Sequence, residues 1–322
     1  MNDTGEMQPP ADPVSVPGFV TFTRQQWADL GRAFRPRDRD AGVDRDSGPV
    51  PEGEPVEIYP PLCRLLGALD SARRAGTRQV ADLLEVSDGR RPFVVGMAGS
   101  VAVGKSTIAR DLGRFLARHP GLSPVDVIST DSFLYPNDEL EARGLTARKG
   151  FPESYDRRRL VATLAAVRAG EEAVEIPVYS HRDYDIVPGR RHLVRRPAAL
   201  IVEGLNVLQV GRDEADGSDP PTLVSDFLDW SIYVDAAEAD IARWHRERLL
   251  SLRRAGAGEA TGFLRWFCSL SDEEARAVVG QAWSAINSVN LRDHIAPTRA
   301  RASMILYKRA DHRVSHVLVR GV

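Results

Sequence analysis

Cysteine is scarce in this sequence, which contains only Cys63 and Cys268, in unrelated contexts. No C-x-x-C pair occurs, so neither a zinc site nor a disulfide framework is indicated. Long apolar runs are also missing, since none approaches the roughly 20 residues that a helix needs to cross a bilayer. The first residues lack the basic and apolar segments of a secretory signal peptide. We therefore expect a cytoplasmic protein with no membrane association.

An excess of charge of either sign is absent too. Lysine and arginine total 43 against 45 aspartates and glutamates, so the net charge is -2. A near-neutral chain argues against a dedicated nucleic-acid surface, and we expect no nucleic-acid partner. Arginine strongly outnumbers lysine, which we attribute to genome composition rather than to chemistry. The 322 residues are enough for one large domain or two small ones.

The order of the segments favours an α/β fold. Residues 1–17 are polar and rich in proline, which is typical of a disordered tail. Residues 36–55 are charged and rich in glycine and proline, which indicates an exposed loop. From residue 92 strand-like and helix-like segments alternate, which predicts a mostly parallel sheet with helices on both faces. We interpret residues 18–322 as a single domain whose ligands bind beyond the carboxyl ends of the strands.

One loop carries a phosphate-binding signature. Phe93–Val95 form a short apolar run suited to a buried strand, and apolar residues at helical spacing begin at Ile108. Between them, residues 99–106 read G-S-V-A-V-G-K-S, which fits G-x-x-x-x-G-K-[ST] at every fixed position. Glycines let backbone N–H groups point at phosphate oxygens, the lysine adds a mobile positive charge, and the serine hydroxyl is a ligand for Mg²⁺. The residues expected to bind a nucleoside triphosphate are Gly99, Ser100, Val101, Ala102, Val103, Gly104, Lys105, Ser106 and Thr107.

Acidic side chains follow the ends of two predicted strands. Asp131 follows V-D-V-I-S-T and is placed to accept a proton from an attacking hydroxyl or to help hold a metal ion. An aspartate that only caps a helix is the alternative. Glu203 ends the apolar strand A-A-L-I-V-E and is placed to hold Mg²⁺ directly or through water, and a carboxylate facing solvent is the alternative. Ser106 and Glu203 are therefore the predicted metal ligands.

Several residues outside the loop are candidates for binding a second substrate. Tyr179, His181 and Tyr184 lie in a short, non-periodic segment. Such side chains can line a small-molecule pocket or occupy ordinary half-buried positions. The predicted helix I-A-R-W-H-R-E-R carries Arg248, one of three arginines there that are candidates to stabilise the charge of a transferring phosphoryl group. Asn287 lies near a helix end, where it either caps the helix or donates to a ligand.

Five motifs occur in a fixed order: G-S-V-A-V-G-K-S-T, K-G-F-P-E-S-Y-D, P-V-Y-S-H, V-E-G-L-N-V-L-Q and A-P-T-R-A-R-A-S. Together they closely resemble the bacterial type I pantothenate kinases, from about Phe19 to the end of the chain. The resemblance implies a P-loop NTPase-type kinase fold related to uridine kinases and phosphoribulokinases, with ATP and Mg²⁺ as cofactors and pantothenate as substrate. It also implies a homodimer, feedback inhibition by coenzyme A, and a role in the first step of coenzyme A synthesis.

The resemblance also implies roles for individual residues. Lys105 and its loop would bind the phosphates, Asp131 would be the catalytic base, and Arg248 would lie near the phosphoryl group. The implied pantothenate-binding residues are Tyr179, His181, Tyr184, His245 and Asn287. Positions associated with coenzyme A are Arg110, His181 and Leu252, and a position that contacts the nucleotide is His312.

The sequence departs from the family pattern around this pocket. His245 stands where a tyrosine is usual. Leu249 and Leu252 replace aromatic residues, and Leu264 and Phe267 stand where the family tends to have phenylalanine and tyrosine. Replacing an aromatic residue by leucine removes contact area and about 1 kcal/mol of specific packing. The expected change therefore lies in the wall of the pocket and not in the phosphate-binding residues.

Two explanations fit this pattern, and a third class of function is disfavoured. The protein is either a pantothenate kinase with weakened coenzyme A feedback or a paralogue that phosphorylates another small hydroxylated substrate, such as a nucleoside or a specialised-metabolite precursor. A nucleotide-binding regulator without catalysis would not need the set Lys105, Ser106, Asp131, Glu203 and Arg248, because a binder has no use for a base.

Overall fold

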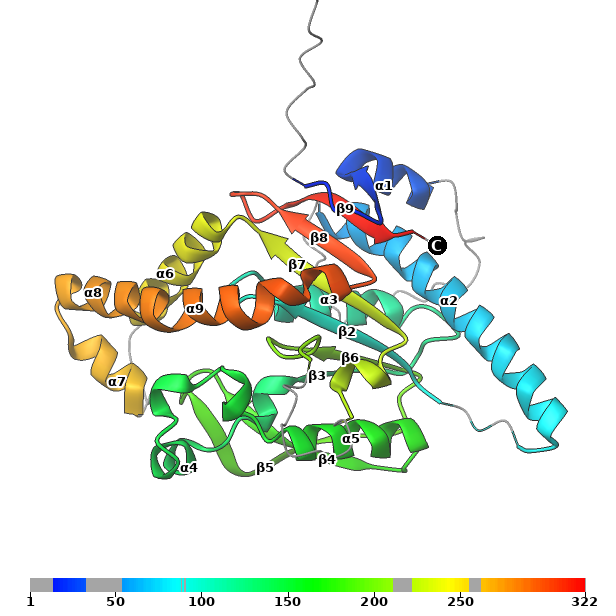
Figure 1. The fold of residues 1–322 in the computed structure, drawn as a ribbon, viewed down its shortest axis with the longest axis horizontal. Helices are drawn as coiled ribbons and strands as arrows, with labels where there is room; N and C mark the ends of the chain where they lie inside the picture. Colours follow the sequence, from blue (N-terminus) through cyan, green and yellow to red (C-terminus); the bar gives the residue numbers. More distant parts are fainter. Residues whose placement is uncertain are drawn as a thin grey trace, which may run out of the picture.

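The computed structural model describes residues 14–32, 54–87, 89, 91–210, 222–254 and 262–321. Within them, a central sheet runs in the order β1-β9-β8-β7-β2-β6-β3, and β4 and β5 form a separate sheet (Figure 1). The strands are β1 (Phe19–Thr23), β2 (Phe93–Gly99), β3 (Val125–Ser129), β4 (Val174–Ser180), β5 (Asp185–Val194), β6 (Ala199–Glu203), β7 (Trp230–Ala236), β8 (Met304–Lys308) and β9 (Val314–Arg320).

The helices are α1 (Arg24–Arg32), α2 (Glu54–Leu84), α3 (Lys105–Leu116), α4 (Asn137–Ala142), α5 (Arg157–Ala169), α6 (Glu238–Arg254), α7 (Gly262–Ser269), α8 (Asp272–Ala282) and α9 (Ser288–Asn290). π-helical turns at Trp283–Asn287 and Leu291–Ile295 flank α9, so that α8 and α9 look continuous in Figure 1. Among the described residues, we find no helix that combines the length and the apolar character needed to cross a membrane.

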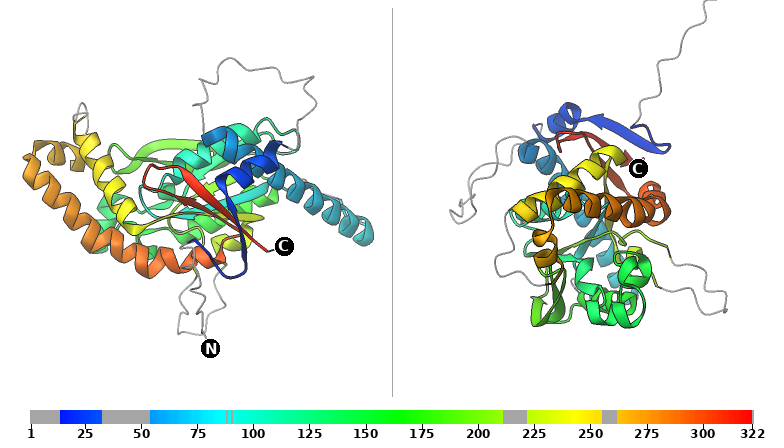
Figure 2. Two further views of the ribbon diagram at one scale, coloured as in Figure 1. Left: turned by 90° about the horizontal axis from the view of Figure 1, so that it is seen from above. Right: turned by 90° about the vertical axis from the view of Figure 1, so that its left-hand side faces the viewer.

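The central sheet is mostly parallel, as the sequence predicts. The pairs β3–β6, β6–β2, β2–β7 and β7–β8 are parallel, whereas β9 and β1 add antiparallel pairs at one edge. Every residue of β2 and β6 is buried, which is typical of parallel strands covered on both faces. The helix α3 packs against β3 and β6, and α8 and α9 cross the other side of the sheet (Figures 1 and 2). The predicted α/β class is therefore confirmed.

The N-terminal boundaries differ from the sequence prediction. The prediction of a disordered tail over residues 1–17 is wrong for its last residues, because Val14 and Val16 are buried in the main core. Residues 1–13 lie outside the described residues. The next segment, β1, pairs with β9, and this pairing holds the two valines against the sheet, where burial of apolar surface stabilises them. The charged loop expected at 36–55 is also shorter, since α2 begins at Glu54, and its other residues are not described.

The helices α6, α7 and α8 enclose a second, smaller core. Phe267, Ala275 and Val279 are buried there, with partly buried leucines from α6 and α7 packed around them. A capping box of Ser271 and Glu274 begins α8. In Figure 1 these helices lie on the side of the sheet away from the free end of α2. They form one wall beside the carboxyl edge of the central sheet.

Candidate active site

The loop of residues 99–106 joins the carboxyl end of β2 to α3, at the edge where ligands bind in such sheets. The chain curls through positive φ angles of 145° at Gly99, 58° at Ala102 and 98° at Gly104. These conformations turn successive backbone N–H groups toward one point, as an anion site requires. Because α3 begins at Lys105, its free N–H groups and positive dipole end face the same point.

Lys105 and Ser106 direct their polar atoms at oxygens beside the loop. Lys105 is 8% exposed, and its Nζ donates to the Ser100 carbonyl at 2.8 Å. Ser106 Oγ donates to Glu203 Oε1 at 2.9 Å, and Glu203 is buried. The hydroxyl and the carboxylate meet because β2 and β6 are paired neighbours that end at the same edge. The structure thus brings the two predicted metal ligands into contact.

The Ser106–Glu203 pair suits Mg²⁺ held jointly with a nucleotide. Mg²⁺ prefers oxygen ligands and is usually bound by one or two carboxylates together with substrate phosphates. In the part of the chain that the structure describes, no cluster of three or more His, Cys, Asp or Glu side chains could hold a metal on its own. A magnesium ion at this edge would therefore depend on the phosphates beside the loop.

Asp131 lies in a 3₁₀ turn directly after β3, facing the turn that follows Glu203. The two turns approach closely, because a Cβ on Gly204 would lie only 1.8 Å from Thr130 Oγ1. A side chain at position 204 would therefore force the two turns apart. The buried Tyr155 hydroxyl donates to Asp131 Oδ1 at 3.5 Å.

Four predicted residues from different elements act on one another through their charges. Burial lowers the pKa of Lys105, the carboxylates of Glu203 and Asp131 raise it, and the Arg248 guanidinium lowers it again. Of the arginines singled out on α6, Arg243 is held by Asp240 and by the Ala310 carbonyl. Arg248, by contrast, is within electrostatic reach of the phosphate loop.

Tyr179, His181 and Tyr184 lie at the end of the β4–β5 hairpin, although the sequence of this segment shows no strand-like period. The ring centroid of Tyr179 is 5.3 Å from that of His181 and 6.5 Å from that of Tyr184. Pro177 and a bulge between Pro177 and Tyr179 interrupt the alternation that would have predicted a strand. The three side chains are therefore carried on a defined hairpin.

Lys149 connects this hairpin to Asp131. Its Nζ donates to Asn137 Oδ1 at 2.6 Å and to the Tyr184 carbonyl. The same nitrogen lies 5.3 Å from the ring centroid of Tyr179 and 5.4 Å from that of Tyr184. Burial lowers the pKa of Lys149, whereas nearby carboxylates, including that of Asp131, raise it. The hairpin rings, this ammonium group and the predicted base therefore share one region.

His245 and Asn287 come from α6 and from the turn after α8. Asn287 Nδ2 donates to His245 Nε2 at 3.2 Å, and the imidazole is only 7% exposed. Burial and, to a smaller extent, the Arg248 charge lower the pKa of His245 to about 4. The ring is therefore neutral near pH 7. Because an amide nitrogen can only donate, Nε2 is the acceptor and the ring proton is assigned to Nδ1.

The residues associated with the nucleotide and with coenzyme A are more dispersed. His312 stacks on Trp244, with ring centroids 4.2 Å apart. Arg110 is exposed on α3, and Leu252 is exposed on α6. The expectation for the pocket wall is wrong at Phe267, which is 0% exposed and packs between helices in the small core, with Leu249 and Leu264 against it.

Three residues near the loop were not singled out from the sequence: Lys149, Tyr155 and Lys308. The first two lie within K-G-F-P-E-S-Y-D, so that motif could have identified them. Lys308 ends the apolar strand β8 and is buried against the phosphate loop. A lone lysine at the carboxyl end of an apolar strand was the only sequence signal for it.

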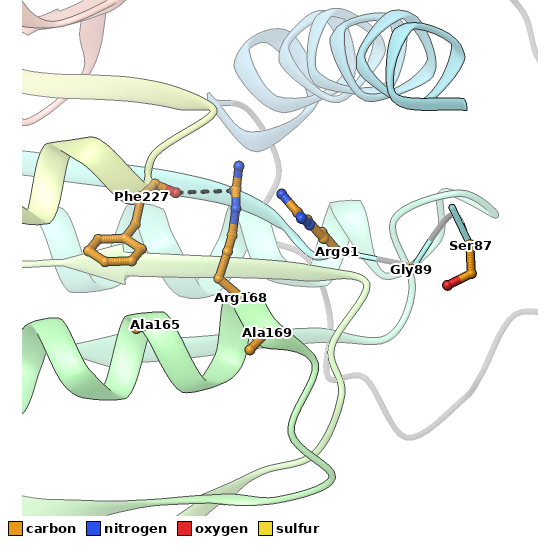
Figure 3. Close-up of a pocket in the computed structure, with 7 residues that line it drawn as sticks. All are labelled: Ser87, Gly89, Arg91, Ala165, Arg168, Ala169 and Phe227. Carbon is orange, nitrogen blue, oxygen red and sulfur yellow. Dashed lines mark hydrogen bonds between the residues drawn. The ribbon is translucent and has the colours of Figure 1, made fainter. Parts of the chain in front are cut away.

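A cavity of about 440 Å³ lies at the opposite edge of the sheet, lined by Ser87, Gly89, Arg91, Ala165, Arg168, Ala169 and Phe227 (Figure 3). Arg168 donates to both carboxylate oxygens of Asp229, at 2.7 and 3.1 Å, and to the Phe227 carbonyl at 3.2 Å. Its guanidinium is therefore used to hold the segment before β7. The groups suited to chemistry converge at the loop and not at this cavity.

Comparisons with known proteins agree with the site. Residues 94–247 match the phosphoribulokinase/uridine kinase family. A pantothenate kinase from Leifsonia xyli subsp. xyli is 46% identical over 307 residues, which cover 94% of each chain. A pantothenate kinase from Parvibaculum lavamentivorans is 50% identical over 316 residues, covering 95% of this chain and 94% of the relative. The structure of a D-glycerate 3-kinase from Cryptococcus neoformans gives a TM-score of 0.52 at 11% identity, covering 79% of this chain and 97% of that one, which shows a similar fold alone.

Proposed function

This chain belongs to the pantothenate kinases, and from that membership we propose that it transfers the γ-phosphoryl group of ATP to the primary hydroxyl of pantothenate, the first step of coenzyme A synthesis. Relatives of that name share 46–50% identity with nearly the whole chain. The observation that carries the proposal is the convergence of Lys105, Glu203, Asp131 and Arg248 at the carboxyl edge of the sheet. A phosphoryl-transfer enzyme needs this combination of cations, a metal ligand and a base.

The loop and its neighbours bind the nucleotide in this proposal. Backbone N–H groups of residues 99–106 and the Lys105 ammonium bind the β and γ phosphates. Ser106 and Glu203 would hold Mg²⁺, which would neutralise phosphate charge when bound. His312, supported by its stack on Trp244, contacts the nucleotide beside β8.

Asp131 serves as the base and the surrounding residues orient the acceptor. Asp131 takes the proton of the acceptor hydroxyl as that oxygen bonds to the γ-phosphorus and the bond from this phosphorus to ADP breaks, so that ADP leaves. Tyr155 keeps the carboxylate aligned. Arg248 and Lys105 neutralise the charge that develops on the transferring group. The residues that bind pantothenate are Tyr179, His181 and Tyr184 on the hairpin and His245 and Asn287 on the helical wall.

Substitution of Asp131 tests this mechanism. Asp131→Asn keeps the shape of the side chain and removes the base, so kcat should fall about 10²-fold or more while ATP affinity stays unchanged. The assay is ATP consumption with Mg²⁺ and pantothenate, with the product mass confirmed. Asp138→Asn, an exposed aspartate in the nearby α4, is the matched control. Unchanged turnover in Asp131→Asn would remove the base from the mechanism. A wild-type protein that binds ATP but leaves pantothenate unmodified would favour another small alcohol as the acceptor.

Coenzyme A is proposed to compete with ATP, with weaker inhibition than in relatives that have an aromatic wall. The supporting observation is Leu252, an exposed leucine on α6 in place of an aromatic residue. Leu252→Phe should therefore lower the coenzyme A concentration for half inhibition, and Arg110→Ala should raise it because one phosphate partner is lost. The measurement is the coenzyme A concentration for half inhibition at one ATP concentration, for the wild type and both variants side by side. Equal values for all three proteins would contradict the proposal.

A homodimer is also proposed, with α2 as the contact element. Val80, Leu83, Leu84 and Val86 are 55%, 81%, 62% and 58% exposed, and the first three share one face of the helix. This end of α2 extends away from the sheet (Figure 2). Leu83→Glu should convert dimer to monomer in light scattering, whereas Gln79→Glu, which adds the same charge beside that face, should not. A monomeric wild-type protein would overturn this assignment.

A further inference from the structure

The positions of the lysines do not follow from composition. The chain has 40 arginines but only three lysines, Lys105, Lys149 and Lys308. Lys105 begins α3 at the end of the phosphate loop, and Lys149 donates to the Tyr184 carbonyl beside the hairpin rings. A preference for arginine across the genome explains the 40 arginines, but it does not explain why the remaining lysines gather at one edge of the sheet. Lys308 has no role in the mechanism described above.

Lys308 lies directly behind the phosphate loop. It is the last residue of β8 and is 6% exposed. Its Nζ donates to the Val103 carbonyl at 2.9 Å, and a Cβ on Gly104 would lie 2.9 Å from the same nitrogen. The ammonium also lies 5.4 Å from the ring centroid of Trp244 on α6. A charged group is therefore packed between the loop, a strand and a helix.

The bond to Val103 has a consequence for the other side of the loop. In a trans peptide the C=O of one residue and the N–H of the next point in opposite directions. When Lys308 holds the Val103 carbonyl on the outer side, the Gly104 N–H is turned to the inner side. That inner side is where the loop N–H groups converge on phosphate in the proposed function.

We propose that Lys308 is a positioning residue of the phosphate loop, which fixes the Val103–Gly104 peptide for anion binding and places a second buried positive charge behind it. This inference rests on the proposed function, since it concerns the binding of ATP. Lysine suits the position because its ammonium is compact, whereas the wide planar guanidinium of arginine would not fit against both Val103 and Gly104.

A purely structural role makes a different prediction. The contact of Lys308 with Trp244 would stabilise the packing of β8 on α6 whatever the ligand. A charge that acts on phosphate has an effect that grows with ligand charge, from adenosine to ADP to ATP. The dependence of affinity on the number of phosphates therefore separates the two roles.

The experiment is calorimetric titration of adenosine, Mg·ADP and Mg·ATP into the full-length protein and three variants. Lys308→Met removes the charge and the donor, and Lys308→Gln keeps a neutral donor for the Val103 carbonyl. Arg309→Gln removes the neighbouring exposed charge and is the matched control. Thermal unfolding without ligand shows that each variant folds, and Lys308→Gln carries the comparison if Lys308→Met does not.

The expected result for Lys308→Met is a Kd for ATP raised about 30-fold, a smaller rise for ADP, and a Kd for adenosine within about twofold of wild type. Lys308→Gln should lie between wild type and Lys308→Met, and Arg309→Gln should match wild type. Equal losses for all three ligands, or no loss for ATP, would overturn the inference. A wild-type protein that binds ATP no better than adenosine would instead overturn the proposed function itself.

Discussion

The buried imidazole of His245 should make stability depend on pH in a way that one substitution removes. Its pKa is about 4 in the folded protein, against 6.5 for an exposed histidine. The unfolded chain therefore takes up a proton below pH 6.5 that the folded protein refuses until the pH is near 4. The contribution of His245 to the free energy of unfolding is therefore fully present above pH 6.5. It is lost progressively as the pH falls toward 4.

The size of the effect follows from these two values. Between about pH 7.5 and about pH 5, the linkage relation gives a loss of about 2 kcal/mol from this group alone, rising to about 3 kcal/mol when both states are protonated. His245→Gln removes the titrating group and keeps a polar partner for Asn287. Equilibrium urea unfolding of both proteins at the two pH values gives the difference between their pH dependences. Contributions from all other groups cancel in that difference.

The control is His181→Gln, which removes an exposed imidazole from the hairpin. This variant makes the same substitution at an exposed position, so it measures any effect of the exchange that does not depend on burial of the ring. If His245→Gln loses as much stability between the two pH values as the wild type does, the imidazole is not buried and neutral as described, and the tautomer assigned above would fall with it.

Three further predictions concern the neighbours of the two site carboxylates. Tyr155→Phe should lower kcat about fivefold at unchanged ATP affinity, because one long hydrogen bond to Asp131, at 3.5 Å, contributes about 1 kcal/mol; steady-state kinetics with wild-type kcat would exclude the tyrosine from the mechanism. Ser106→Ala should raise the Mg²⁺ concentration for half-maximal activity about tenfold, since its hydroxyl is lost beside Glu203, and an unshifted Mg²⁺ titration would argue against this metal site. Gly204→Ala should lower the free energy of unfolding by about 1–3 kcal/mol and reduce kcat, because the added Cβ would lie 1.8 Å from Thr130 Oγ1; urea unfolding and turnover that both equal wild type would refute the close approach of the two turns.

The carboxyl edge of the central sheet was the most predictable part of the molecule. The loop of residues 99–106 is a contiguous signature, and Asp131 and Glu203 each follow an apolar strand, so local sequence places all three at strand ends. Parallel strands leave the sheet at one edge, and general rules for such sheets then bring these groups together. The contact between Ser106 and Glu203 bears this out.

The parts that were not predicted depend on partners far away in the chain. The strand β1 exists because it pairs with β9, nearly 300 residues later, and Val14 and Val16 are buried as a consequence. The sequence pattern did not predict the hairpin β4–β5, because Pro177 and a bulge interrupt the alternation typical of strands. The sequence predicted Phe267 in the wall of the pocket. Because α7 packs on α6 and α8, Phe267 is instead buried in a small core.

Short-range signals in the sequence determined that this protein binds phosphate, where its acidic groups lie, and which family it resembles, because backbone curvature, helix starts and strand ends are set by neighbouring residues. Only the tertiary structure decided which charged side chains interact. Arg248 lies near enough to Lys105 to lower its pKa, whereas Arg243 is bound to Asp240. His245 is buried and neutral, and Lys308 donates to the Val103 carbonyl. Distance and burial set these interactions, and both arise only when segments that are remote in the chain pack together.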